Sequence, residues 1–310
     1  MKVGVILNPV AGGGRLKRCW PEIEAALKPH CTELDMRETQ ETGDGERLAL
    51  AFAGQACDLV IAAGGDGTAS EAADGLLQAR AETGREVALG ILPCGTGTDF
   101  ARGLGLPRDP VEVVKRIVEA KPRAMDAGRV SFIDEHGALA SRHFINIASL
   151  GLSGATDRAV NADKRKGRVS AKALFYWRTV VEFLRYRFQN VRIWVDDAEP
   201  FEARVALVSA CNGRYFGAGM MIAPDAEPDD GQFDAVIVQA AGKLGLLRDL
   251  RLLYGGRHRD HHAIRILRCR KLTVEPLDPT NVPLVDVDGE APGCAPATFE
   301  ILPGALLLRC

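Results

Sequence analysis

Short runs of apolar residues alternate with stretches of helix-forming composition in the first half of the chain. Runs at residues 3–7, 59–63 and 87–92 have the length and β-branched content of buried parallel strands. Helical composition follows at Trp20–Leu27, Glu46–Ala53 and Ala69–Ala79. This series predicts an α/β domain with a parallel sheet.

The pattern changes from Arg129 onward. The apolar runs become short and alternating, as in VSFID, HFINIAS, VRIWVDD and FDAVIVQA, with turns between them. Alternation with a period of two predicts antiparallel strands, so we expect a β-sandwich-like domain. A chain of 310 residues is long enough for two cores. We place the boundary between the domains after residue 126, with the β-rich domain at 127–298.

Each of the three predicted strands runs into a glycine-rich loop. Glycine lets the backbone adopt positive φ and approach a ligand closely, and a following helix start favours an anion such as a phosphate. Ligands bind beyond the carboxyl ends of parallel strands, so we expect the three loops to face one crevice. The predicted nucleotide contacts are Asn8, Pro9, Gly12, Thr39, Gly64, Gly65, Asp66, Gly67, Thr68, Gly95 and Thr96.

Two of these loops also carry an acid, Asp66 in the second and Asp99 in the third. A carboxylate repels a phosphate unless both bind a cation, which predicts Mg²⁺. The chain has no GxxxxGK[ST] loop and no GxGxxG after its first strand. The sequence therefore excludes a P-loop enzyme and an ordinary dinucleotide-binding domain.

The net charge of −2 hides two basic segments. Residues 158–192 carry ten Lys or Arg against two acids, and residues 243–271 carry nine against two. Such segments on an otherwise acidic chain indicate an acidic partner, either nucleic acid or anionic lipid. Within the first segment an apolar stripe suits either a protein core or a membrane interface. This stripe consists of Leu174, Trp177, Val181 and Leu184.

No apolar run reaches the roughly 18 residues that span a bilayer, and Met1 leads directly into a strand. The eight cysteines are scattered without a CxxC pair, which fits reduced thiols. We therefore expect a soluble, cytoplasmic protein with peripheral membrane contact. The group His258, His261 and His262 is interpreted as an exposed basic turn rather than a metal site.

The loops NPVAGGGR, GGDGT (Gly64–Thr68) and PCGTGTDFAR (Pro93–Arg102) resemble the diacylglycerol kinase catalytic-domain family, which includes bacterial lipid kinases and sphingosine kinases. The resemblance continues through FINIASLGLSG, CNGRYFGAGMMIAPDAEPDDGQFD and DGE (Asp288–Glu290), so it covers nearly the whole chain. One departure is Thr98, where the family usually has asparagine. Threonine keeps an oxygen but lacks the amide donor.

The resemblance implies an ATP-dependent lipid kinase with its active site in the cleft between the domains. It implies that the final strand, residues 299–310, packs back on the first domain. It also implies that Glu290 accepts the proton of the lipid hydroxyl, and that a structural Mg²⁺ is held by Asp230 and the carbonyls of Glu227 and Gln232. The predicted catalytic residues are Glu290, Asp66, Asp99 and Asp126.

Two alternatives stay open. An NAD kinase-like enzyme for a small molecule shares GGDGT, but DGE, the CNG stretch and the form of the third loop favour a lipid kinase. A non-catalytic nucleotide- or lipid-binding protein would not need the four acids. We expect a diacylglycerol-like acceptor and no nucleic-acid partner. The sequence does not identify the lipid, and it leaves the oligomeric state open between a monomer and assemblies such as a homodimer.

Overall fold

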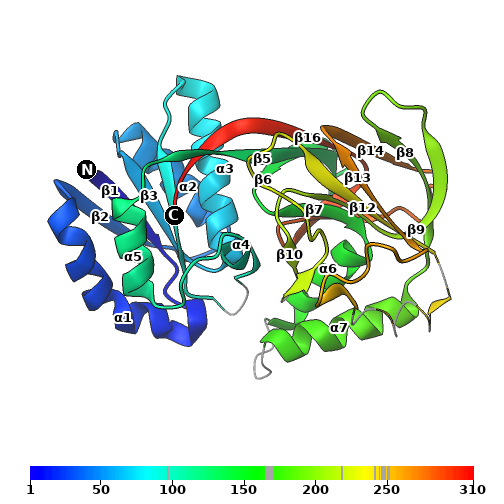
Figure 1. Cartoon of the computed structure of the whole chain (residues 1–310), viewed down its shortest axis with the longest axis horizontal. Helices are drawn as coiled ribbons and strands as arrows, with labels where there is room; N and C mark the ends of the chain where they lie inside the picture. The colour runs from blue at the N-terminus through cyan, green and yellow to red at the C-terminus, as the bar shows by residue number, and fades with distance from the viewer. Residues whose placement is uncertain are drawn as a thin grey trace. The chain divides into compact units, whose positions relative to one another are not determined.

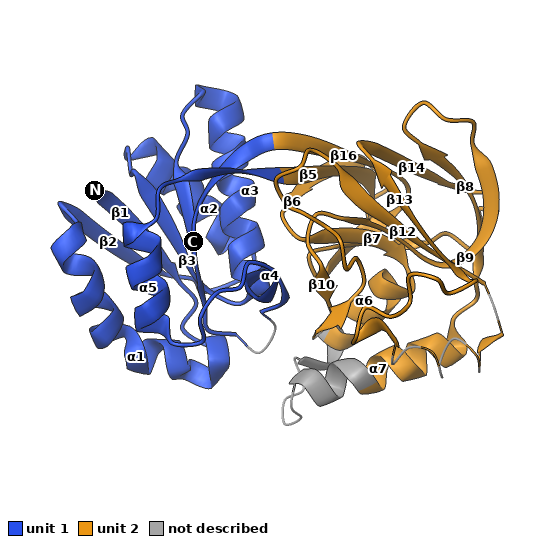
Figure 2. Ribbon diagram, viewed as in Figure 1, with its two compact units in different colours: residues 1–126, 304–310 blue, residues 127–303 orange. Residues whose placement is uncertain are grey.

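The computed structural model describes residues 1–95, 98–164, 171–217, 219–240, 242, 243, 245, 249 and 252–310. The chain forms two compact units (Figure 2). Unit 1 consists of residues 1–126 and 304–310, and unit 2 consists of residues 127–303. The return to unit 1 therefore begins at residue 304, whereas residues 299–303 of the predicted final strand belong to unit 2.

Unit 1 alternates strands and helices along the chain, as the apolar pattern predicts (Figure 1). Its elements are β1 (Lys2–Leu7), α1 (Ala11–Leu27), a 3₁₀ turn (Lys28–His30), β2 (Glu33–Glu38), α2 (Asp44–Gly54), β3 (Leu59–Gly64), α3 (Asp66–Thr83), β4 (Ala88–Pro93), α4 (Asp99–Gly103), α5 (Pro110–Glu119) and the start of β5 (Arg123–Asp134).

The strands of unit 1 lie in the order β2, β1, β3, β4, followed by the end of β16 (Glu290–Arg309), and each neighbouring pair is parallel. Side chains on one face, such as Val5 and Ile61, share a buried cluster with α1 and α5. On the other face Phe52 of α2 packs so closely on Gly4 that a Cβ at Gly4 would lie 2.5 Å from its ring. Helices thus cover both faces, so the strands are apolar throughout.

The first helix departs from the predicted Trp20–Leu27. The assigned element α1 begins at Ala11, but Gly12, Gly13 and Gly14 have φ values of 59°, 66° and 78°. These values belong to a left-handed turn rather than an α-helix, and glycine adopts them without a Cβ clash. Regular helix follows this turn, so the glycine loop and the helix form one continuous segment.

Unit 2 is built mainly from strands. Its elements are the rest of β5, β6 (Leu139–Phe144), β7 (Ile147–Gly151), α6 (Leu152–Lys164), α7 (Ala171–Arg185), β8 (Gln189–Val195), β9 (Phe201–Cys211), β10 (Tyr215–Phe216), β11 (Met220–Met221), β12 (Phe233–Gln239), β13 (Ile264–Cys269), β14 (Lys271–Pro276), β15 (Leu284–Val287) and most of β16.

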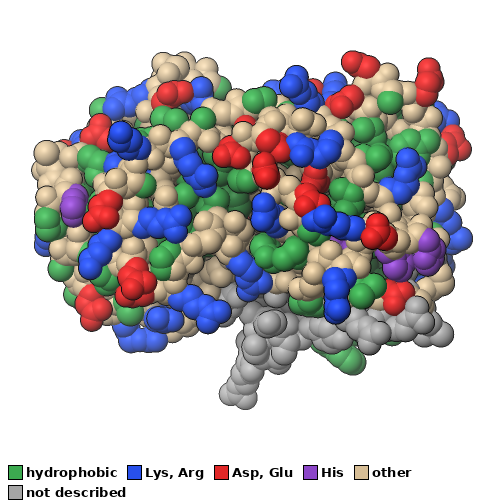
Figure 3. Space-filling model, viewed as in Figure 1, with side chains coloured by type: hydrophobic (Ala, Val, Ile, Leu, Met, Phe, Trp, Pro, Cys, Tyr) green, Lys and Arg blue, Asp and Glu red, His purple; other side chains and the backbone are tan. Residues whose placement is uncertain are grey.

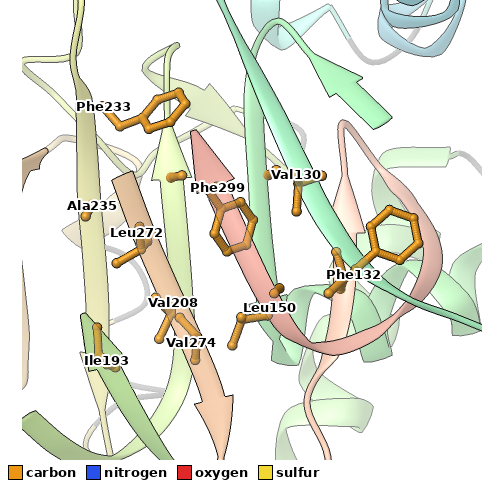
Figure 4. Close-up of a cluster of buried hydrophobic side chains, with 14 of the residues drawn as sticks. Val130, Phe132, Leu150, Ile193, Val208, Phe233, Ala235, Leu272, Val274 and Phe299 are labelled. Carbon is orange, nitrogen blue, oxygen red and sulfur yellow. The ribbon is translucent and has the colours of Figure 1, made fainter. Parts of the chain in front are cut away.

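The antiparallel pairing of unit 2 closes a circuit. β7 pairs with β9, β9 with β8, β8 with β14, β14 with β16, β16 with β15, and β15 with β7. Side chains from these strands fill a common interior, where Phe299 of β16 lies among Leu272, Val208 and Leu150 (Figure 4). Phe144 and Phe233 stack in the same cluster with ring centroids 5.4 Å apart. The predicted β-sandwich-like second part is therefore confirmed in its strand pairing.

The exposure of the predicted apolar stripe can be followed in the described part of α7. Trp177 and Leu184 are 63% and 52% exposed, and Val181 is half-buried. Phe183 of α7 and Tyr186 just after it are buried. The side chain of Leu174 lies outside the described residues. The stripe is therefore not core at these two positions. Within the described chain, no helix is both long and apolar enough to cross a membrane.

Candidate functional site

The carboxyl edge of the sheet in unit 1 brings predicted residues from three loops together. The N–H of Asn8 donates to the carbonyl of Ala63 at 2.9 Å, and its Nδ2 donates to Thr68 Oγ1 at 3.3 Å. Thr39 donates its N–H to Leu7 O at 2.9 Å. Adjacent parallel strands place their carboxyl ends side by side, and these bonds fasten the first loop to the GGDGT turn.

The third loop joins the same corner. The N–H of Cys94 donates to Gly64 O at 2.8 Å, and a Cβ on Gly12 would lie 2.4 Å from Cys94 O. The N–H of Asp99 donates to Asp66 Oδ2 at 2.8 Å. The two predicted acids therefore belong to one site. Thr96 and Gly97 lie outside the described residues, whereas Gly95 directly follows Cys94.

The glycines of this corner have different backbone conformations. Gly12, Gly13 and Gly14 form a run of positive φ, an arrangement in which successive N–H groups can line an anion-binding concavity. Gly65 precedes α3 with φ −95° and ψ −172°, and Gly67 has no atom within 4 Å of a Cβ position. Open backbone at the start of an 18-residue helix fits a phosphate group. The residues present therefore fit a nucleotide.

Thr98, the departure from the family pattern, precedes α4 and makes no side-chain capping bond. Its carbonyl accepts the N–H of Arg102 at 2.9 Å. The start of α4 is instead tied to Asp66 through the N–H of Asp99.

A second group of family-like segments meets in unit 2. The carboxylate of Asp288 accepts the N–H groups of Ile145, Asn146 and Ile147 at 3.0, 3.2 and 2.9 Å. Asn212 and Gly213 each donate an N–H to Asn146 O at 2.9 Å. The FINI, CNG and DGE stretches, far apart in sequence, therefore form one connected corner.

The DGE stretch is a two-residue hairpin turn. Val287 pairs with Glu290, and the two residues between them, Asp288 and Gly289, have φ values of 49° and 94°. Positive φ at both positions is typical of the type I′ turn, for which Asp-Gly is a preferred sequence. Glu290 is thereby the first residue of β16, and its carboxylate pairs with Arg142 of β6 at 3.0 Å. The Glu290 side chain is 33% exposed, so solvent reaches it.

Asp126 and the predicted metal ligands have other partners. Asp126 is buried and accepts the N–H of Gly304 at 2.7 Å. Asp230 accepts the N–H of Gln232 at 3.0 Å and forms an ion pair with Arg268. Arg268 is thus a cationic partner of Asp230 in this structure. The Mg²⁺ site made by Asp230 and the carbonyls of Glu227 and Gln232 stays a prediction from the resemblance.

The histidine group differs from the expected exposed turn. His258 is 1% exposed, and its Nε2 lies 2.8 Å from Ile222 O, whereas His262 is exposed. Burial lowers the pKa of His258. Among the residues that the structure describes, no group of three or more His, Cys, Asp or Glu side chains could hold a metal ion.

Sequence reasoning missed several residues that shape these corners. Glu71 accepts the N–H groups of Gly43 and Gly45, both at 2.9 Å, and so fixes the loop after Thr39. Asp44 caps the same loop, and the side chain of Arg47 together with the N–H groups of Gln40 and Glu41 lowers the pKa of Asp44 to about 2. Asp44 lies between Gly43 and Gly45, which was an available signal, whereas the sequence around Glu71 carries none.

The two units match two known domain families. Residues 2–130 match the diacylglycerol kinase catalytic domain, so unit 1 is a domain of the diacylglycerol kinase class. Residues 146–310 match the YegS C-terminal NAD kinase beta sandwich-like domain. This second match covers more than half of the chain. The chain therefore belongs to the family of YegS-type proteins with a diacylglycerol kinase catalytic domain.

Individual relatives agree with this assignment. A protein of Staphylococcus saprophyticus named diacylglycerol kinase is 29% identical over 95% of this chain and 90% of its own length. A probable lipid kinase YegS-like of Chromohalobacter salexigens is 34% identical over 70% of this chain and 65% of its own length. The crystal structure of a putative diacylglycerol kinase from Bacillus anthracis aligns with a TM-score of 0.76 at 26% identity, covering 99% of this chain and 96% of that one.

The bonds to Asp288 lead to a prediction about stability. Asp288→Ala leaves three N–H groups without their charged acceptor, so we expect the free energy of unfolding to fall by about 3 kcal/mol or more. Urea unfolding followed by circular dichroism measures this change. Asp134→Ala is the matched control, because Asp134 accepts the N–H groups of His136 and Ala138 in an exposed turn. An equal loss of unfolding free energy in both variants would show that the bonds to Asp288 stabilise the fold no more than those to Asp134.

Proposed function

We propose that this chain is an ATP-dependent lipid kinase that transfers the γ-phosphoryl group of ATP to a hydroxyl of a diacylglycerol-like acceptor. The observation that carries the proposal is the hydrogen bond between Asp99 N–H and Asp66, which joins two acids to three phosphate-suited loops. Two carboxylates beside the phosphates would weaken the binding of an anion unless they hold a cation or accept a proton. A phosphoryl-transfer enzyme needs them to hold Mg²⁺.

Unit 1 holds the nucleotide in this proposal. The glycine run at Gly12–Gly14 and the start of α3 bind the phosphates through backbone N–H groups. Asp66 and Asp99 would hold Mg²⁺, which would supply positive charge near the transferred phosphoryl group. The hydrogen bonds from Asn8 to Thr68 and from Cys94 N–H to Gly64 O orient the three loops before the nucleotide binds.

Unit 2 supplies the proton acceptor. A lipid hydroxyl is a poor nucleophile until its proton is accepted, and a carboxylate at hydrogen-bond distance performs this step. The carboxylate of Glu290 suits the role because Arg142 orients it while one third of the side chain stays exposed. Asp288 and Gly289 hold the backbone before it in a fixed turn. In unit 1, Asp126 accepts the N–H of Gly304, and in this proposal it supports the catalytic residues.

The proposal favours a lipid over the small-molecule acceptor of an NAD kinase-like enzyme. Trp177 and Leu184 of α7 expose apolar surface, and Arg185 and Arg187 beside them are exposed cations. An amphipathic helix of this kind suits the interface of an anionic membrane. Acidic and basic side chains are interspersed on the face shown in Figure 3, so this face carries no large patch of positive charge. The proposed membrane contact is therefore assigned to α7.

The role of Glu290 has a direct test. Glu290→Gln keeps the size of the side chain but cannot accept the proton, so turnover should fall at least about 100-fold, the lower end of general-base contributions. ATP affinity should be unchanged, because the nucleotide residues lie in unit 1. Radiolabelled ATP with diacylglycerol in mixed micelles measures turnover.

Glu300→Gln is the matched control for this variant. Glu300 lies on the same strand and also forms ion pairs, with Arg129 and Lys271 at 2.8 and 3.3 Å. We expect its turnover to equal that of the unmodified chain. Near-normal turnover of Glu290→Gln would indicate that Asp66, rather than Glu290, accepts the proton.

Nucleotide binding is tested at Gly65. The backbone angles of Gly65 are ones that valine adopts, and Gly65→Val adds a branched side chain directly before α3. Isothermal titration calorimetry with ATP and Mg²⁺ should show affinity lowered at least about tenfold, or 1.4 kcal/mol. Gly54→Val at the exposed end of α2, where no atom lies within 4 Å of a Cβ, should bind normally. Equal affinities would refute the site.

Membrane docking through α7 is tested by sedimentation with vesicles. Binding to phosphatidylglycerol vesicles should weaken as the salt concentration rises above the physiological level, at which the screening length is about 8 Å. Trp177→Ala should weaken it further, whereas Leu139→Ala, which removes a 78% exposed leucine of β6, should not. The basic residues Lys164, Arg165 and Lys166 have side chains outside the described residues, and neutralising them should act like added salt. Equal binding to neutral vesicles would exclude an electrostatic contribution.

A further inference from the structure

Arg214 of unit 2 is a half-buried cation, and the structure shows no acidic partner for it among the described residues. Its Nε donates to the carbonyl of Ala226 at 2.9 Å. A guanidinium carries five N–H donors, and within the described chain this carbonyl is the one protein acceptor of the Arg214 side chain. Withdrawing a charge from water costs free energy unless an opposite charge compensates for it. The guanidinium therefore suits an anion that comes from outside the protein.

The acids that flank Ala226 in the chain do not compensate the charge of Arg214. Asp225, before Ala226, forms an ion pair with Arg259. Glu227, after Ala226, is exposed, so solvent screens its charge. Neither acid forms an ion pair with Arg214 in the described part of the chain. An anion that reaches this guanidinium does not have to displace a carboxylate.

Hydrogen bonds place the backbone of Arg214 in the same corner as the DGE turn. Gly213 donates its N–H to Asn146 O at 2.9 Å, and Asn146 Nδ2 donates to Tyr215 O at 3.0 Å. The residues on both sides of Arg214 are thus bonded to Asn146. The N–H of Asn146 donates in turn to Asp288 at 3.2 Å. Arg214 therefore belongs to the corner that supplies the proton acceptor in the proposed function.

Close packing fixes the position of Arg214 before any ligand binds. A Cβ at Gly213 would lie 2.1 Å from Asn146 Oδ1, so the chain directly before Arg214 rests against that side chain. The carbonyl of Arg214 accepts the N–H of Ala223 at 3.4 Å. The side chain is held by Ala226 O at the same time. A cation that is already oriented loses little conformational entropy when an anion binds to it.

We propose that Arg214 is the cationic residue of a phosphate-binding subsite in unit 2. With Nε held by a carbonyl, the two terminal amino groups form a planar pair that matches two oxygens of a phosphate group. This phosphate belongs to a phosphorylated lipid or is inorganic phosphate. The link to catalysis rests on the proposed function, in which the transferred phosphoryl group ends on the lipid. The binding of phosphate by Arg214 does not rest on it.

Chemical labelling of the whole chain tests the subsite at Arg214 itself. Phenylglyoxal modifies guanidinium groups, and mass spectrometry of the digested protein measures the rate at each arginine. Saturating inorganic phosphate or dioctanoyl phosphatidate should slow the labelling of Arg214 about tenfold. Arg192 is the matched control, because it pairs with Glu202 at 2.8 Å and is 43% exposed, and its rate should not change.

The probes distinguish the two sources of phosphate. Protection by inorganic phosphate as well as phosphatidate would show that the phosphate group alone is bound. Protection by phosphatidate but neither by inorganic phosphate nor by dioctanoylglycerol would show that the phosphate is recognised as part of a lipid. Equal protection by dioctanoylglycerol, which has no phosphate, would overturn the subsite. Unchanged labelling with every probe would overturn it as well.

Variants give an independent measurement of the same subsite. Arg214→Gln keeps an amide donor for Ala226 O but removes the charge, so its affinity for dioctanoyl phosphatidate in isothermal titration calorimetry should fall at least about tenfold, or 1.4 kcal/mol. Arg214→Lys restores the charge without the planar pair and should recover part of this loss. Arg259→Gln removes an arginine that already has an acidic partner and should bind phosphatidate normally.

Failure of this inference differs from failure of the proposed function. If no lipid is phosphorylated but phosphate protects Arg214, the proposed function fails and the subsite stands. If lipid is phosphorylated while neither inorganic phosphate nor phosphatidate protects Arg214, the subsite fails and the proposed function stands. Equal affinity of Arg214→Gln and the unmodified chain for phosphatidate would also overturn the subsite.

Discussion

Three consecutive backbone N–H groups at Ile145–Ile147 need acceptors where β6 gives way to β7, and the carboxylate of Asp288 supplies them. A buried N–H without a partner costs free energy comparable to a lost hydrogen bond, so irregular backbone inside a domain requires such a group. Because Asp288 is itself part of a two-residue turn, the same bonds fix the hairpin between β15 and β16. The need of these three N–H groups for an acceptor therefore also fixes the position of Glu290, which directly follows the turn.

The loops at the carboxyl edge of the sheet in unit 1 also provide acceptors for their backbone N–H groups. N–H groups in the chain segments that leave β1, β3 and β4 donate to carbonyl oxygens of neighbouring segments and to the carboxylate of Asp66. Glycine permits the close approach, as at Gly12 against Cys94 O, where any side chain would collide. A loop fastened in this way presents N–H groups to a ligand without first having to order itself, which lowers the entropic cost of binding.

Local patterns in the sequence predicted the strand types and the glycine loops, because period and turn chemistry depend on neighbours in the chain. The positive φ values at Gly12–Gly14 agree with the glycine turn expected after the first strand, whereas the helix that follows begins before the predicted Trp20. Contacts between distant residues were also beyond reach. Ser149 and Asp286 are separated by 137 positions, and in VDVDGE the buried acid at 286 does not differ by pattern from the exposed acid of a turn.

Three acids within five residues show how environment assigns different chemistry to one functional group. Asp286 is buried, and its burial together with the neighbouring acid Asp157 raises its pKa. Asp288 accepts three N–H donors, and such donors stabilise a carboxylate without a proton. Glu290 faces a guanidinium and solvent, which leaves an oriented carboxylate that a hydroxyl can reach. Strand alternation alone would put 286, 288 and 290 on one face, and the turn at 288 and 289 separates their surroundings. Replacing the turn by a continuous strand would therefore abolish the difference among the three acids even with every side chain retained.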